Sequence, residues 1–245
     1  MSPKIIHYCW FGGGPISAES QKCMESWKKY CPDYKIIEWN DQNFDISTNR
    51  YAQQAYEAKK YAFVSDYVRL AVLYEYGGIY LDTDVELVRP LDELLELPGF
   101  MGFQTNNEVA TGLGFGARKG NSVVQALLRD YDALDFLKAD GSADLTPCPE
   151  RNTRVLQALG VRKDGTRQSI AEMEIFPAEY FCPMDFYSRE LRVTPKTYSI
   201  HRYAESWKPK PSAVSRILQR LLKKHYYTWY CPLRGRIEGR LRKRT

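Results

Sequence analysis

The sequence lacks several features that would place it in a common class. Its 245 residues include three histidines and six cysteines, and none of the cysteines forms a CxxC pair or a zinc-like cluster with histidine. No stretch reaches about 18 consecutive apolar residues, and the N-terminal "MSPKIIHYCWFGGG" has too short an apolar run for a signal peptide. We therefore expect a cytoplasmic protein whose cysteines are reduced and buried.

Two glycine motifs are also missing. Neither GxGxxG nor GxxxxGKS occurs, which excludes the dinucleotide fingerprint and the P-loop. Instead, a glycine loop at 12–14 follows an apolar stretch that predicts a strand over 4–11. Ser17 is a plausible N-cap for a helix over 17–30, and a second strand is expected over 34–39. This βαβ unit, with glycines at the carboxyl end of its first strand, fits a nucleotide-binding crevice.

The basic residues are distributed unevenly along the chain. Residues 208–245 hold twelve Lys or Arg and only one acid, a net charge of +11, whereas residues 1–207 carry a net charge of −6. The basic segment mixes Leu and Ile with aromatic residues, so it predicts an amphipathic helix on an anionic membrane surface. A helix packed on the body is the alternative, and we expect no nucleic-acid partner.

The remaining pattern predicts one α/β domain. We expect a long helix over 53–76, stopped by Gly77, and a strand at "IYLD". Further strands are expected near "PGFMGFQT", 173–177 and 197–202, and helices near 121–138 and 151–159. The predicted organisation is a domain over 1–207 followed by the basic tail over 208–245.

A pair of carboxylates stands at the end of the predicted strand "IYLD". Asp82 and Asp84 stand two residues apart, so both side chains can enter one cleft. Carboxylate oxygens suit Mg²⁺ or Mn²⁺, and a metal held by few protein ligands keeps sites for a diphosphate. A solvated acidic turn is the structural alternative for a bare DxD.

The helix before this strand carries a second polar group. Ser65 and Arg69 are i and i+4, and Asp66 and Arg69 are i and i+3, so the three share one face. A carboxylate beside a guanidinium can bind sugar hydroxyls and a phosphate. A surface ion pair is the alternative.

The stretch "AFVSDYVRLAVLYEYGGIYLDTDVE" resembles the DxD-containing glycosyltransferases that group yeast initiating mannosyltransferases with bacterial capsular and lipopolysaccharide enzymes. It is more distantly similar to the catalytic domains of clostridial glucosylating toxins. Three more segments match in order: "KIIHYCWFGGG", "SWKKYCPDYKIIEWND" and "TYSIHRYAESW". One departure is visible, because "LTPCPERNT" lacks the Gly-Pro that the family leads us to expect.

The resemblance implies a GT-A fold, a Rossmann-like mixed sheet flanked by helices, and a set of site residues. Asp84 is implied as the direct metal ligand and Trp10 as the residue that stacks on the base, with a core tryptophan at a strand end as the alternative. Gly112 and Gly114 can allow close backbone approach to the acceptor, or they mark a strand bulge. The implied catalytic residues are Asp82, Asp84, Arg69 and Asp66. The implied donor-binding residues are Tyr8, Trp10, Ser65, Asp66, Arg69, Asp82, Ser206 and Trp207, and the implied metal ligands are Asp82, Asp84 and His201.

The resemblance also implies an activity. It predicts a retaining transferase that uses Mn²⁺ or Mg²⁺ and a nucleotide-sugar donor, with a UDP-sugar favoured over GDP-mannose. The expected acceptor is a hydroxyl of a capsule, lipopolysaccharide or lipid-linked oligosaccharide, at the inner face of the cytoplasmic membrane.

Two other functions fit part of the pattern. Phosphohydrolases of the haloacid-dehalogenase type also place DxD after a strand, but nearer the N-terminus and followed by Thr or Val and then an apolar residue. Here Val85 is followed by Glu86. A non-catalytic sugar- or nucleotide-binding protein would keep the fold and lose the aspartates, and both aspartates are present.

Overall fold

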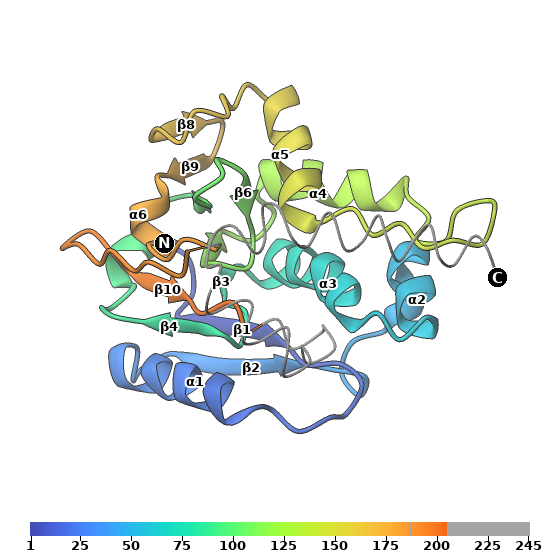
Figure 1. Ribbon diagram of the computed structural model, residues 1–245, viewed down its shortest axis with the longest axis horizontal. Helices are drawn as coiled ribbons and strands as arrows, with labels where there is room; N and C mark the ends of the chain where they lie inside the picture. Colours follow the sequence, from blue (N-terminus) through green and yellow to red (C-terminus); the bar gives the residue numbers. More distant parts are fainter. Residues whose placement is uncertain (187, 205–245) are drawn as a thin grey trace.

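The computed structural model describes residues 1–186 and 188–204. These residues form a domain around one mixed sheet (Figure 1). The predicted tail over 208–245, with Ser206 and Trp207, lies outside the described residues, and the domain boundary at 207 stays a prediction. The sheet has eight strands, seven of them in the order β2-β1-β3-β7-β5-β9-β8, with β6 paired to β5. A second sheet pairs β10 with β4. The α/β class is confirmed.

The pairing directions place the site. Strands β1 and β2 are parallel, as are β1 and β3, so their carboxyl ends meet at one edge of the sheet. The pairs β3–β7 and β5–β7 are antiparallel, and β5–β9 is parallel. The strands are β1 Ile5–Cys9, β2 Lys35–Trp39, β3 Gly78–Tyr80, β4 Val85–Leu87, β5 Gly99–Phe103, β6 Val109–Ala110, β7 Phe115–Ala117, β8 Gln168–Ile170, β9 Met173–Phe176 and β10 Ser199–His201.

Helices cover the sheet with two apolar layers. The layer made by α2 to α5 packs on one group of buried side chains, and α1 with β4, β10 and α6 packs on another (Figure 1). The helices are α1 Ala18–Tyr30, α2 Arg50–Glu57, α3 Tyr61–Tyr76, α4 Ser122–Asp132, α5 Cys148–Ala158 and α6 Ala178–Phe181, with short 3-10 helices at Ile46–Thr48 and Asp92–Glu96.

The βαβ unit is confirmed. The Ser17 hydroxyl accepts a hydrogen bond from the Ser20 N–H at 3.1 Å, which is the expected N-cap of α1. Trp27 of α1 is fully buried, and its indole N–H donates to the Val85 carbonyl at 2.7 Å. The helix is thereby attached directly to the strand that follows the DxD pair.

The prediction of one helix over 53–76 is wrong. Two helices, α2 and α3, occupy this region, and Lys59 between them has a positive φ of 57°. The turn closes where the Lys60 N–H donates to the Ala55 carbonyl at 2.8 Å. Because glycine or asparagine usually stands at such a left-handed position, a lysine there gives no signal in the sequence. Packing of α2 against α3 imposes the break.

Two other boundaries differ from expectation. The helix predicted over 121–138 ends at Asp132, where Ala133 caps it, and the helix predicted over 151–159 starts earlier, at Cys148. Pro149 stands in the first turn of α5, where a missing N–H costs nothing.

The described cysteines are reduced and buried, as the sequence predicts. Cys9, Cys23, Cys31, Cys148 and Cys182 are free and buried among the described residues. Within that same part of the chain, no helix combines the length and the apolar character needed to cross a bilayer.

Two glycines turn the chain from α3 into β3. Gly77 caps α3, and its N–H donates to the Leu73 carbonyl at 2.9 Å. Gly78 has a φ of 102°, and a Cβ added there would lie 2.8 Å from the Ile5 carbonyl oxygen. Only glycine fits this conformation and this approach, so the pair explains how a helix runs directly into a buried strand.

A buried histidine stabilises the same turn. The Trp39 indole, which can only donate, contacts His7 Nδ1 at 3.0 Å, so Nδ1 is the acceptor. The proton therefore sits on Nε2, which lies 2.9 Å from the Gly77 carbonyl oxygen and donates to it. Burial disfavours the charged ring and lowers the pKa of His7 to about 4, although the Gly77 carbonyl opposes this shift.

This histidine predicts a pH dependence of stability. The folded pKa is below the value of about 6.5 expected in the unfolded chain, so the unfolded state alone takes up the proton as pH falls through that range. Lowering the pH from 7 to 5 should cost about 2 kcal/mol of unfolding free energy through His7. Urea unfolding at both pH values, on wild type and on His7→Gln, measures the difference. Equal pH dependence in the two proteins would contradict this role.

Candidate active site

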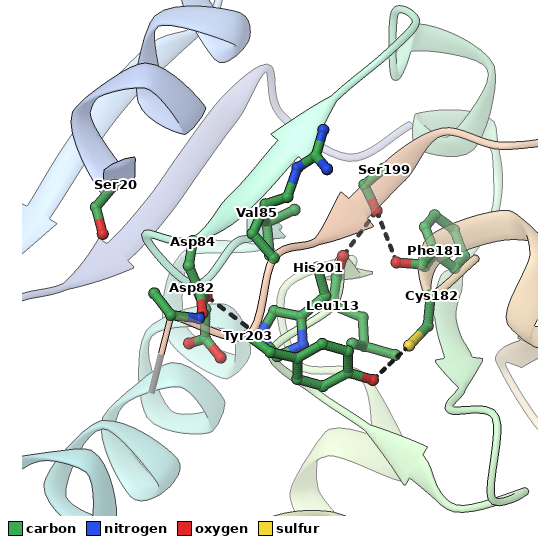
Figure 2. Close-up of polar contacts among 12 residues, drawn as sticks. Ser20, Asp82, Asp84, Val85, Leu113, Phe181, Cys182, Ser199, His201 and Tyr203 are labelled. Carbon is green, nitrogen blue, oxygen red and sulfur yellow. Dashed lines mark hydrogen bonds and ion pairs between the residues drawn. The ribbon is translucent and has the colours of Figure 1, made fainter. Parts of the chain in front are cut away.

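Three elements bring the polar residues together. Helix α3 supplies Asp66 and Arg69, the loop after β3 supplies Asp82 and Asp84, and β10 supplies His201. Strand β10 reaches the loop because it pairs with β4 in a register that sets His201 opposite Val85. Figure 2 shows Asp82, Asp84 and His201 converging at the end of this small sheet.

Arg69 is the cation at the centre of the cluster. Its side chain is only 7% exposed, and one terminal nitrogen, Nη2, lies 3.0 Å from Asp66 Oδ1 and 3.2 Å from Asp82 Oδ1. Its Nε donates to the Ser65 carbonyl at 3.1 Å. The guanidinium also lies over the Tyr80 ring, 4.9 Å from the centroid. These contacts hold the charge in one place between two carboxylates.

Burial decides the protonation of Asp66. Loss of solvent raises the pKa of Asp66 to about 6, with the neighbouring Asp82 charge adding to the shift and the Arg69 guanidinium opposing it. The carboxyl is therefore mostly ionised at neutral pH and gains a proton in mildly acidic solution. The surface ion pair considered for Asp66 and Arg69 is excluded, because both side chains are buried.

Asp82 is fixed on one side and closely approached on the other. Its Oδ1 accepts from the Tyr80 hydroxyl at 2.9 Å. Its main-chain N–H donates to the Gly112 carbonyl at 3.1 Å. A Cβ added at Gly112 would lie 1.9 Å from Asp82 Oδ2, a distance that no real side chain tolerates. Gly112 therefore leaves the space that the carboxylate occupies.

Asp84 is held by β10 and the residues after it. His201 Nε2 lies 3.2 Å from Asp84 Oδ1, and the Ala204 N–H donates to Oδ2 at 2.8 Å. Burial opposes ionisation of Asp84, but the His201 charge and these hydrogen bonds outweigh it and lower the pKa to about 2. For His201, burial also opposes the charged form, and attraction to Asp84 raises the pKa overall.

The three residues fit a divalent cation. One ligand atom from each of Asp82, Asp84 and His201 can be chosen so that all lie within 4.8 Å of one another. The other ring nitrogen of His201, Nδ1, is buried and has no hydrogen-bond partner among the described residues. Two carboxylates and an imidazole form a donor set that suits Mn²⁺, and Mg²⁺ accepts the carboxylates.

This part of the chain matches a known family. Residues 17–100, which contain Asp66, Arg69 and the DxD pair, match the family described as "Glycosyltransferase sugar-binding region containing DXD motif". Over residues 17–100 the chain is similar to the DXD-containing glycosyltransferases. The resemblance stated from the sequence is thus confirmed over these residues, and the predicted mixed sheet flanked by helices is observed.

Curated relatives of this chain carry transferase names. The chain is 30% identical over 149 residues to the Inositol phosphoceramide mannosyltransferase 3 of Schizosaccharomyces pombe, covering 55% of this chain and 38% of the relative. It is 28% identical over 148 residues to the Homo sapiens Alpha-1,4-N-acetylglucosaminyltransferase, covering 60% and 38%. The chain thus spans less than two fifths of the length of both relatives.

One solved structure aligns with part of this chain. The structure titled "PaToxG Glycosyltransferase" aligns with a TM-score of 0.47 and 21% identity, over 64% of this chain and 69% of that chain.

Trp10, the predicted base-stacking residue, lies on an open groove. Trp10 follows β1 and donates its indole N–H to the Gly14 carbonyl at 2.6 Å. A groove of about 390 Å³ is lined by Trp10, the glycine loop, Glu38 and the start of the loop after β2. Tyr8 is buried, and its hydroxyl donates to Glu38 at 2.5 Å. Tyr8 therefore lies beneath the groove, and its role in donor binding stays a prediction.

Of the remaining predicted residues, Ser65 and Gly114 lie in the described part of the chain, whereas Ser206 and Trp207 do not. Ser65 lies on the same helix as Asp66, but its hydroxyl donates to the Tyr61 carbonyl at 3.1 Å, within its own helix. Ser206 and Trp207 fall outside the described residues, so their placement over the diphosphate stays a prediction. Gly114 has a φ of 137° beside Phe181, and its approach to an acceptor is also a prediction.

A further layer of polar residues lies behind Arg69 and Asp66, and reasoning from the sequence missed it. Thr111 Oγ1 lies 3.5 Å from Arg69 Nη1 and accepts from the Asn152 amide at 3.1 Å. The thiol of Cys148 contacts both Thr111, at 3.3 Å, and the Asp66 carboxylate. All three residues are buried. Cys148 and Asn152 belong to the segment that departs from the family pattern, and no local signal in it marks them.

Proposed function

We propose that this protein is a metal-dependent glycosyltransferase that moves a sugar from a nucleoside-diphosphate sugar to an acceptor hydroxyl. One observation carries the proposal: Asp82, Asp84 and His201 converge within reach of one cation, directly beside the buried Arg69 and Asp66. A divalent metal between the two aspartates would supply positive charge to the leaving diphosphate.

Arg69, Asp66 and Trp10 have separate roles in the proposed binding of the donor. Arg69 is a fixed cation whose donors are already oriented by Asp66, Asp82 and the Ser65 carbonyl, so it costs little to order when a sugar phosphate arrives. Asp66 presents a carboxylate that can accept hydrogen bonds from sugar hydroxyls. Trp10 offers an aromatic face to the base, which any base can use.

We infer retention of configuration by attack from the front face. A double displacement needs a carboxylate poised beside the anomeric carbon. Asp66 and Asp82, the two carboxylates that contact Arg69, are both paired with its guanidinium. The departing diphosphate, held by Arg69, would then take the proton from the acceptor hydroxyl. A covalent sugar trapped on a side-chain carboxylate and detected by mass spectrometry would contradict this mechanism.

The donor and acceptor are proposed more broadly. The relatives named above are a mannosyltransferase and an N-acetylglucosaminyltransferase, so UDP- and GDP-sugars are both candidates, and the sequence favours a UDP-sugar. The proposed acceptor is a polysaccharide or lipid-linked glycan. We also propose that residues 208–245 dock this protein on the inner face of the cytoplasmic membrane, on the strength of their +11 charge. Unchanged liposome binding after truncation at Lys208 would rule out the docking.

Thermal unfolding with a nucleotide panel tests the function. The full chain is heated with UDP, GDP and their sugars, each with and without Mn²⁺. Because a ligand that binds the native state raises the melting temperature, one nucleotide class should raise it, and only when Mn²⁺ is present. A folded protein that responds to no nucleotide would contradict the proposal.

A further inference from the structure

The chain makes an unusual turn directly after His201. Tyr203 has a positive φ of 52°, a conformation that residues other than glycine rarely adopt. Such a conformation persists only where surrounding contacts enforce it, and it is found preferentially at functional sites. The turn lies two residues beyond a candidate metal ligand, so its surroundings bear on the site.

The Tyr203 side chain is anchored on all sides. It is 8% exposed, and its hydroxyl lies 2.9 Å from the Cys182 sulfur (Figure 2). Its ring packs edge-on to Phe186 with centroids 5.0 Å apart, and the Arg189 guanidinium lies 5.3 Å from the ring centroid. These contacts come from the segment that joins α6 to β10. They hold Tyr203 in its left-handed conformation.

The anchored turn acts on Asp84 through the main chain. The N–H groups on either side of Tyr203 both point at Asp84. Arg202 donates to its main-chain carbonyl at 2.9 Å, and Ala204 donates to Oδ2 at 2.8 Å. An extended residue at 203 would carry the Ala204 N–H away from the carboxylate. The left-handed turn is therefore what allows one short segment to hold Asp84 at two points.

The same residue acts on His201 through its ring. The rings of His201 and Tyr203 lie with centroids 4.3 Å apart and planes inclined by 59°. The His201 side chain is thus held between Asp84 on one side and the Tyr203 ring on the other. Tyr203 acts on the site through the main chain beside Asp84 and through the His201 ring, so its influence on the candidate metal ligands is indirect.

We propose that Tyr203 is a positioning residue that fixes two of the three candidate metal ligands, Asp84 and His201, and thereby sets the affinity for the cation. The proposal rests on the proposed function of this site. Residues behind the ligands commonly change metal affinity by about 10-fold to 100-fold when they are replaced. Nothing in the sequence pattern marks Tyr203 for this role, because the motif residues on either side of it carry the resemblance.

Direct metal binding distinguishes this role from a purely structural one. Mn²⁺ alone is titrated into the full chain, and the free ion is followed by electron paramagnetic resonance. Tyr203→Phe keeps the ring against His201, whereas Tyr203→Leu keeps apolar bulk and loses the ring. We expect Tyr203→Phe, which loses the hydroxyl contact with Cys182, to bind Mn²⁺ several-fold more weakly than wild type. Tyr203→Leu, which also loses the ring, should bind about tenfold more weakly or worse.

Two controls make the comparison decisive. Lys59→Gly relieves another positive φ, between α2 and α3, and should leave Mn²⁺ affinity unchanged. Cys182→Ala releases the Tyr203 hydroxyl and should weaken Mn²⁺ binding several-fold, which decides the matter if Tyr203→Leu does not fold. Wild-type affinity in both Tyr203→Leu and Cys182→Ala would overturn the role of Tyr203 alone. Failure of wild type to bind Mn²⁺ would overturn the proposed function as well.

Discussion

Replacing Asp84 with alanine should abolish metal-dependent nucleotide binding and almost all transfer. The carboxylate is the candidate ligand held most firmly, by His201 and by the Ala204 N–H. A metal contributes several kcal/mol of charge stabilisation in the transition state. Since each step of about 1.4 kcal/mol is tenfold in rate, the loss should be about a thousandfold or more. Sugar transfer and the Mn²⁺-dependent thermal shift are measured on the same preparations.

A matched variant separates this effect from loss of surface charge. Asp92 is half exposed and pairs with Lys4 at 2.7 Å. Asp92→Ala removes the same side chain away from the cluster and should keep both the activity and the thermal shift. If Asp84→Ala retained a normal Mn²⁺-dependent shift, Asp84 would not be a metal ligand.

Replacing Arg69 with methionine should unfold the protein more readily and also inactivate it. The guanidinium is buried between Asp66 and Asp82, so its removal leaves two carboxylates facing each other without a cation. Breaking a buried pair of this kind costs about 3–5 kcal/mol. Urea unfolding at neutral pH measures the loss, and the nucleotide-dependent thermal shift reports on the site in whatever folded protein remains.

The exposed arginine Arg154 provides the comparison. Its side chain is 61% exposed and lies 3.1 Å from Asp130. Arg154→Met should change the unfolding free energy by less than about 1 kcal/mol. Adding Asp66→Asn to Arg69→Met should recover part of the lost stability, because it removes one of the uncompensated charges. A full loss of 3–5 kcal/mol in Arg154→Met, or none in Arg69→Met, would contradict the account of this cluster.

Local sequence determined the parts of the fold that depend on neighbours in the chain. Ser17 marked the start of α1, Gly77 marked the end of α3, and the apolar runs marked β1 and β2. These signals are strong because capping, positive φ and strand hydrophobicity are decided within a few residues. The order of the motifs also carried the resemblance to the DXD-containing glycosyltransferases, and the match over residues 17–100 agrees with it.

The tertiary structure alone decided what surrounds those motifs. It split the predicted helix at Lys59, because packing between α2 and α3 outweighed a sequence with no helix-ending residue there. It brought His201 to Asp84 through the pairing of β10 with β4, and it set Gly112 against Asp82. It also placed Cys148 and Asn152 behind Asp66. These contacts join segments that are distant in the chain, and their register depends on the whole sheet. No pattern within one segment can encode them.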